Sequence, residues 1–237
     1  MQTFIYSISF ILINQIYSWS YLFWTPARLV WFRGVPVSKR FLSLKMFDKI
    51  NAHVSKCASF STAELEVFNT LIQAKSYPKK TLLLQEGEIC NFEAYINKGC
   101  IRSYYLDENG FELTLQFAVE DWWVSDITSF HEHQPSNMFI ETLEDCEILV
   151  LNPGTKELLL QQVPAFERFF RILIQRHLAV VQKRLFQTIA WPAQERYQDF
   201  LNLYPDIPQR VAQHYIASYL GISPEFLSKI RTRMAKR

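Results

Sequence analysis

The sequence has few cysteines, and they do not stand at the spacings that hold metal clusters. Cys57, Cys90, Cys100 and Cys146 are scattered, and no two of them form a C-x-x-C pair. This argues against a zinc ribbon or an iron–sulfur cluster. We therefore expect reduced, buried thiols in a cytoplasmic protein that carries no metal and no cofactor.

The sequence also lacks the short motifs on which many enzymes depend. It has no P-loop, no G-x-G-x-x-G stretch and no Ser-His-Asp order with the glycines of a nucleophile elbow. Hydrophobic residues make up 49% of the 237 residues, enough to build packed cores in one large or two modest domains. These features predict a folded binding protein that is not an enzyme.

Net positive charge is confined to the carboxy-terminal segment. Residues 209–237 contain six Lys or Arg side chains and one acid, Glu225, while the whole chain has a net charge of +2. The residues before 209 therefore carry a net charge of −3. A basic segment that follows a slightly acidic body is typical of a nucleic-acid-binding module attached to a regulatory domain.

Charge is absent altogether from residues 1–27. This aromatic-rich segment has the length of a membrane span of about 20 residues. However, serines, Asn14 and Gln15 interrupt it, and it lacks the basic start of a signal peptide. Three interpretations remain: a membrane anchor, a packed extension, or upstream sequence outside the native protein. We favour the third, with Met46 as the native start and residues 1–45 as an apolar extension.

The basic segment, residues 209–237, has the pattern of a helix-turn-helix. Ala217 and Gly221 are four residues apart, a small residue where two helices cross and a glycine where the chain turns. Ser223 is suited to the N-cap of the second helix, with Pro224 at its first position. Apolar residues at helical spacing complete the pattern: Ile216, Leu220, Ile222, Leu227, Ile230 and Met234.

Short strands are predicted in the middle of the chain, after a helical pattern over residues 56–75. That helix has a capping box, with Glu64 three residues after Ser61. A turn over 107–110 ends in Gly110, which suits a positive φ. Strands this short and evenly separated predict an antiparallel sandwich or barrel. They are expected at 81–85, 93–97, 101–106, 112–118, 138–143 and 147–151.

A long helix is predicted from about residue 164 to residue 190, where Trp191 and Pro192 end it. It has two apolar faces and therefore needs two partners. One face, of Phe166, Phe169 and Leu173, would pack on the strands. The other resembles a coiled-coil stripe and would pair with a second copy of the chain. The residues of this dimer seam are Phe170, Ile174, Leu178, Val181, Leu185 and Ile189.

This order of strands, one long helix and a helix-turn-helix resembles the Crp/Fnr family of bacterial transcription regulators, over about residues 47–237. The resemblance also rests on Gly87-Glu88, Lys98-Gly99, Asn109-Gly110 and residues 121–130. It implies an α+β fold: an antiparallel β-roll (a jelly-roll-like double-stranded β-helix) over 46–163, a dimerisation helix over 164–190, and a winged helix-turn-helix over 191–237. It also implies a homodimer whose partners are double-stranded DNA, RNA polymerase and a small-molecule effector of unknown identity.

The expected sensor pocket departs from the family pattern. Family members that bind cyclic nucleotides hold the phosphate with a Gly-Glu-Leu stretch and a nearby arginine. Here Ser125 and Asp126 replace the glycine and the glutamate, and no Lys or Arg lies between Arg102 and Lys156. A buried phosphate without a cation is poorly compensated, so we expect no useful binding of cyclic AMP. A cyclic-nucleotide-responsive regulator and a membrane-tethered signalling protein are the alternatives. The expected pocket residues are Trp123, Ser125, Asp126, Ile127, Thr128, Ser136 and Asn137.

The helix that starts at Ser223 is expected to enter the major groove of DNA. Glu225, Ser228 and Lys229 would contact bases. Pro224 and Lys229 stand where family members that read a G·C pair strongly have arginines, so we do not expect the usual consensus operator. A wing after this helix would be truncated. The residues expected to contact the DNA backbone are His214, Ser218, Ser223, Arg231 and Arg233.

Overall fold

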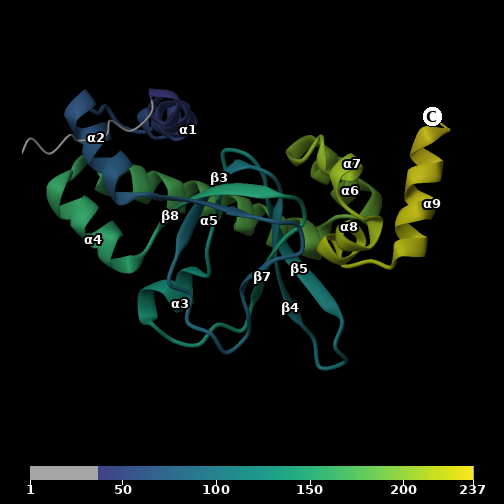
Figure 1. Ribbon diagram of the computed structural model, residues 1–237. Helices are drawn as coiled ribbons and strands as arrows, with labels where there is room; N and C mark the ends of the chain where they lie inside the picture. Colours follow the sequence, from purple (N-terminus) through teal and green to yellow (C-terminus); the bar gives the residue numbers. More distant parts are fainter. Residues whose placement is uncertain (1–36, 237) are drawn as a thin grey trace, which may run out of the picture.

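The computed structural model describes residues 37–236, with side chains from Met46 onward (Figure 1). The first helix, α1 (Val37–Ser55), runs through Met46 without a break. The three interpretations of residues 1–27 lie outside the described residues. Among the helices that are described, none combines the length and the apolar character needed to cross a bilayer.

Two four-stranded antiparallel sheets face each other and enclose an apolar core, which confirms the predicted β-roll. One sheet has the order β1-β8-β3-β6 and the other the order β2-β7-β4-β5. Ile96, Ile101, Ile140 and Ile148 are buried between them. The strands are β1 (Gln73–Tyr77), β2 (Leu82–Leu84), β3 (Glu93–Lys98), β4 (Ile101–Leu106), β5 (Glu112–Ala118), β6 (Trp123–Val124), β7 (Phe139–Thr142) and β8 (Cys146–Leu151).

The predicted helix over residues 56–75 is only partly correct. The capping box of Ser61 and Glu64 is present and starts α2 (Thr62–Leu71). Residues 73–75, however, belong to β1, which pairs with β8 from Gln73 opposite Val150. This pairing partner lies far along the chain, so the local helical pattern gave no sign of it. Local sequence patterns also did not predict β6, α3 (Ile127–Glu132) and α4 (Pro153–Gln162).

The long helix α5 (Ala165–Ala190) runs along the sheets and connects the two ends of the molecule (Figure 1). At its start, Phe166 and Phe169 are fully buried against α1, α2, α4 and the strand residues Tyr95 and Leu149. The expected contact of this face with the sensor domain is therefore confirmed. The helix ends before Trp191, as predicted.

The helix-turn-helix lies beyond the far end of α5 (Figure 1). Gly221 has a φ of +65° and ends the first helix, and the Ser223 hydroxyl accepts from the Phe226 N–H to cap the second. Both predicted features are confirmed. Within the described residues no strand follows α9. The helices of this domain are α6 (Ala193–Leu203), α7 (Ile207–Arg210), α8 (Gln213–Leu220) and α9 (Pro224–Ala235).

Candidate functional site

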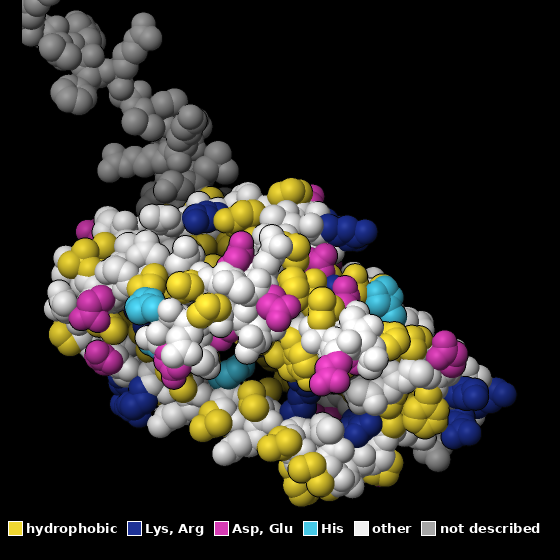
Figure 2. Space-filling model, turned by 90° about the horizontal axis from the view of Figure 1, so that it is seen from below, with side chains coloured by type: hydrophobic (Ala, Val, Ile, Leu, Met, Phe, Trp, Pro, Cys, Tyr) yellow, Lys and Arg dark blue, Asp and Glu magenta, His cyan; other side chains and the backbone are white. Residues whose placement is uncertain are grey.

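Helix α9 presents a polar face to solvent at one end of the molecule. Leu227 and Ile230 are buried in the helix-turn-helix core and fix the rotation of the helix. This rotation leaves Glu225, Ser228 and Lys229 exposed, at positions that share one helical face. Figure 2 shows basic side chains gathered at this end, while acidic side chains are spread over the rest of the visible surface. The expected base-contacting residues are thus brought together on one accessible surface.

Four of the five residues expected to contact the DNA backbone are free of the sensor domain, and the fifth, Ser218, is bonded to it. His214, Ser223 and Arg233 are exposed and Arg231 is half-buried. Ser218 points instead toward the sensor domain. Its hydroxyl donates to the Glu112 carbonyl oxygen at 2.6 Å and accepts from the Thr114 N–H at 2.8 Å. The expectation for Ser218 is therefore corrected: in this arrangement it joins α8 to β5.

The helix-turn-helix domain is docked on the sensor domain through a shared apolar core. Phe117 of β5 packs against the rings of Phe200, Tyr204 and Tyr219. The Tyr204 hydroxyl also donates to the Phe117 carbonyl oxygen at 3.0 Å. The junction at Trp191, where α5 ends and the DNA-binding helices begin, is consequently bridged by direct contacts between the two domains.

Three arginines reinforce this docking. Arg210 donates to both Glu120 and Glu144 of the sensor domain, with distances of 2.7–3.0 Å. Burial alone would raise the pKa of Glu120, but Arg210 and the Gly99 N–H together hold it below its ordinary value. Glu120 is therefore an ionised partner of the guanidinium at neutral pH.

Arg102 is the most deeply buried charged side chain of this interface, with 1% of its surface exposed. It forms ion pairs with Glu112 at 2.6 Å and Glu141 at 2.7 Å. Its guanidinium is stacked between the rings of Tyr104 and Tyr215, 3.9 Å from each ring centre. Because Tyr215 belongs to α8, this arginine links the β-roll to the helix-turn-helix. The third arginine, Arg184 of α5, donates to backbone carbonyls on both sides of the same interface.

The loop that would hold a cyclic-nucleotide phosphate is closed by its own side chains. Asp126, expected to face the pocket, is buried and caps α3 by accepting from the Ser129 N–H. Ser136, at the expected arginine position, is also buried and donates to the other Asp126 oxygen at 2.7 Å. Thr128 and Asn137 are exposed and do not line the adjoining cavity. Of the expected pocket residues, Trp123, Ser125 and Ile127 line the adjoining cavity. Four others do not line it, contrary to expectation: Asp126, Thr128, Ser136 and Asn137.

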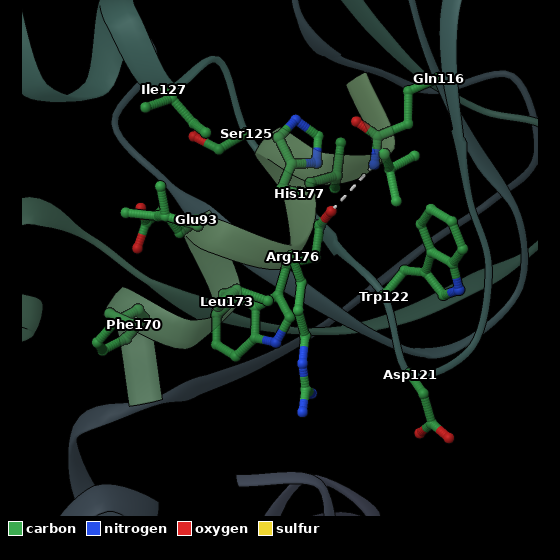
Figure 3. A pocket seen from close by; sticks show the side chains of 14 residues that line it. Glu93, Gln116, Asp121, Trp122, Ser125, Ile127, Phe170, Leu173, Arg176 and His177 are labelled. Atoms are coloured by element: carbon green, nitrogen blue, oxygen red, sulfur yellow. Dashed lines mark hydrogen bonds between the residues drawn. The ribbon is translucent and has the colours of Figure 1, made fainter. Parts of the chain in front are cut away.

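A cavity of about 280 Å³ lies beside this loop, between β6 and α5 (Figure 3). Trp122, Trp123 and Phe170 form aromatic walls. Gln116 and His177 contribute polar groups that no sequence motif indicates. Burial lowers the pKa of His177, so its ring is neutral at neutral pH. Helical periodicity shows which residues of α5 share a face, but it cannot show that the face of His177 lies against β6.

The predicted dimer seam of α5 is exposed along most of its length. Ile174, Leu178, Val181 and Leu185 are between 43% and 61% exposed, and Ile189 is 78% exposed. The expectation that Phe170 belongs to this seam is wrong, because Phe170 is only 5% exposed and packs inside the sensor core. The first turns of α5 are covered by α1, α2 and α4, so the seam that is free for a partner begins at Ile174.

Comparison with known proteins agrees with this architecture. The cyclic nucleotide-binding domain family matches residues 74–162. The cAMP-activated global transcriptional regulator CRP of Escherichia coli is 24% identical over 176 residues, which cover 70% of this chain and 84% of that protein.

Solved structures share the fold at low identity. The c-di-GMP-responsive regulator CLP of Xanthomonas campestris has a TM-score of 0.61 at 16% identity, covering 74% of this chain and 92% of that one. A Crp/Fnr-family protein of Eubacterium rectale has a TM-score of 0.59 at 16% identity, covering 81% and 88%. The β-roll, the long helix and the helix-turn-helix thus form the fold that Crp/Fnr-family regulators have, and residues 74–162 match the cyclic nucleotide-binding domain family.

Proposed function

We propose that the protein regulates transcription as a homodimer that binds double-stranded DNA through α9. The observation that carries this proposal is the exposed face of Glu225, Ser228 and Lys229 on a well-capped helix at the basic end of the molecule. The seam from Ile174 to Ile189 would pair two copies about a two-fold axis. Such a dimer would bind two half-sites on the DNA, about 34 Å apart. Contact with RNA polymerase is part of the same proposal, and no surface of the protein is assigned to it.

The proposal is tested by fluorescence anisotropy on a library of double-stranded oligonucleotides at low salt, with sedimentation of the same protein. We expect selective binding by a species of twice the chain mass. Failure to bind any duplex, or sedimentation as single chains, contradicts the proposal.

Lys229→Ala and Arg233→Ala should have different effects on DNA binding. The lysine faces base edges, so its loss should cost about 1–3 kcal/mol at one operator position and relax the choice of base there. The loss of Arg233 should weaken binding to all sequences alike and reduce its salt dependence. Anisotropy with single-base operator variants, at several salt concentrations, measures both effects. An even loss across the library for both variants would refute these roles.

We further propose that the sensor domain does not bind cyclic AMP. The Asp126–Ser136 hydrogen bond occupies the two groups that stand at the family's glutamate and arginine positions. Calorimetry with cyclic AMP should show no binding in the micromolar range, with the Escherichia coli relative as a positive control. Micromolar affinity would instead favour a cyclic-nucleotide-responsive regulator, the alternative that the family match over residues 74–162 supports.

A further inference from the structure

We infer that the cavity between β6 and α5 binds a flat, uncharged aromatic molecule. This inference rests on the proposed function only in treating the bound molecule as the effector. The walls of the cavity suit a flat aromatic ring. Trp122 lies on one side of the cavity and Phe170 on the other (Figure 3), and the Trp123 ring packs against Phe170 with ring centres 6.0 Å apart. Aromatic side chains gain most from a planar, apolar partner.

The polar groups at the cavity can orient such a ring without requiring a charge. The neutral His177 imidazole has one donor and one acceptor nitrogen, and among the described residues its side chain forms no hydrogen bond. The Gln116 amide nitrogen donates to the Trp123 carbonyl at 3.4 Å, which leaves the amide oxygen as an acceptor. A ligand with one hydroxyl or ring N–H can therefore be held in a fixed orientation.

The charged groups at the cavity do not favour an anion. Glu93 is held at 2.8 Å by Lys156, which is buried beside Phe170. Asp121 accepts from the Tyr95 hydroxyl. Arg176 is exposed, and Figure 3 shows its guanidinium pointing away from Gln116 and Ser125. A phosphate inside the cavity would thus lie near two carboxylates and lose its hydration, while the buried cation beside Phe170, Lys156, is already paired with Glu93.

A second copy of α5 is not the expected occupant. Of the exposed seam residues, only Ile174 also lines the cavity, whereas Leu178, Val181, Leu185 and Ile189 do not. Pairing along the seam would therefore leave the cavity beside the dimer interface. A ligand there would also touch Trp122, whose ring lies 5.2 Å from that of Tyr204 at the end of α6. This contact joins the cavity to the DNA-binding domain.

The inference is tested by calorimetry on the full chain with 1-naphthol and 1-naphthyl phosphate, which share a ring and differ in charge. We expect 1-naphthol to bind at one site per chain, at least about tenfold more tightly than the phosphate. Ile127→Trp, at the exposed rim, should block the cavity and weaken binding at least about tenfold. The neighbouring Thr128→Trp, outside the cavity, should leave it unchanged. Val180→Trp, which fills the cavity from α5, provides a second blocking variant.

The charge of the ligand is checked with Arg176→Gln, which should not change the affinity for 1-naphthol. The inference is overturned if neither compound binds, if the blocking variants bind normally, or if the phosphate binds more tightly through Arg176. DNA binding is measured separately. A protein that binds 1-naphthol as expected but ignores duplex DNA would refute the proposed function and leave the ligand class standing.

Discussion

Leu178→Glu should convert the protein from a dimer to a monomer and lower its operator affinity about 10²-fold or more. Leu178 lies in the middle of the exposed seam of α5 and is 52% exposed in the single chain. A glutamate there is solvated in the monomer, so the fold should survive. In the dimer, two carboxylates would meet in an apolar seam and lose their hydration. A monomer contacts one DNA half-site at a time, so it lacks the additional affinity that a dimer gains by binding two half-sites at once.

Sedimentation and fluorescence anisotropy measure the two effects, and circular dichroism checks the fold. The matched control is Ala179→Glu, which adds the same charge to the adjacent exposed residue, outside the seam. The control should stay dimeric and bind DNA normally. A Leu178→Glu protein that remains dimeric would show that α5 does not form the interface.

Arg102→Met should destabilise the protein by about 3–5 kcal/mol. The substitution leaves Glu141, with 14% of its side chain exposed, without the cation that it faces at 2.7 Å. It also removes the charge between the rings of Tyr104 and Tyr215. Burial alone would lower the pKa of Arg102, but Glu112 and Glu141 raise it, so the arginine is charged in the folded protein. Because Tyr215 belongs to α8, the loss should also loosen the docked helix-turn-helix domain.

Denaturant unfolding measures this loss, with Arg171→Met as a control at an exposed position of α5. The double variant Arg102→Met/Glu141→Gln should recover part of the stability, because it removes the unpaired carboxylate. Losses below about 1 kcal/mol, or strictly additive effects of the two substitutions, would mean that this buried pair does not stabilise the fold.

Much of the fold could be predicted from local sequence signals. The Ser61 and Ser223 caps, the glycines at 110 and 221 and the end of α5 before Trp191 all appear as expected. Strand β1 could not be predicted in this way, because residues 73–75 continue an apparent helical pattern. Only their pairing with β8, more than 70 residues away, makes them extended.

The candidate site was less predictable because it depends on side-chain direction. Ser218 is polar and lies in the helix-turn-helix, but its helix turns it toward β5. Asp126 was expected to face a ligand, yet it caps α3 and accepts from Ser136. His177 and Gln116 have no motif around them, and they become neighbours only because α5 packs on the β-roll.

The sequence by itself determined the order of the main segments, namely the strands, the long helix and the helix-turn-helix, and the basic character of the carboxy-terminal helix. Caps, turns and periodicity act over a few residues, so they can be recognised without knowing the rest of the chain. Tertiary structure decided which face of α5 lines a cavity, which part of its seam is free, and how the helix-turn-helix is held on the β-roll. These outcomes depend on the rotation of each helix against partners far away in the sequence, and that rotation is set by packing of the whole core.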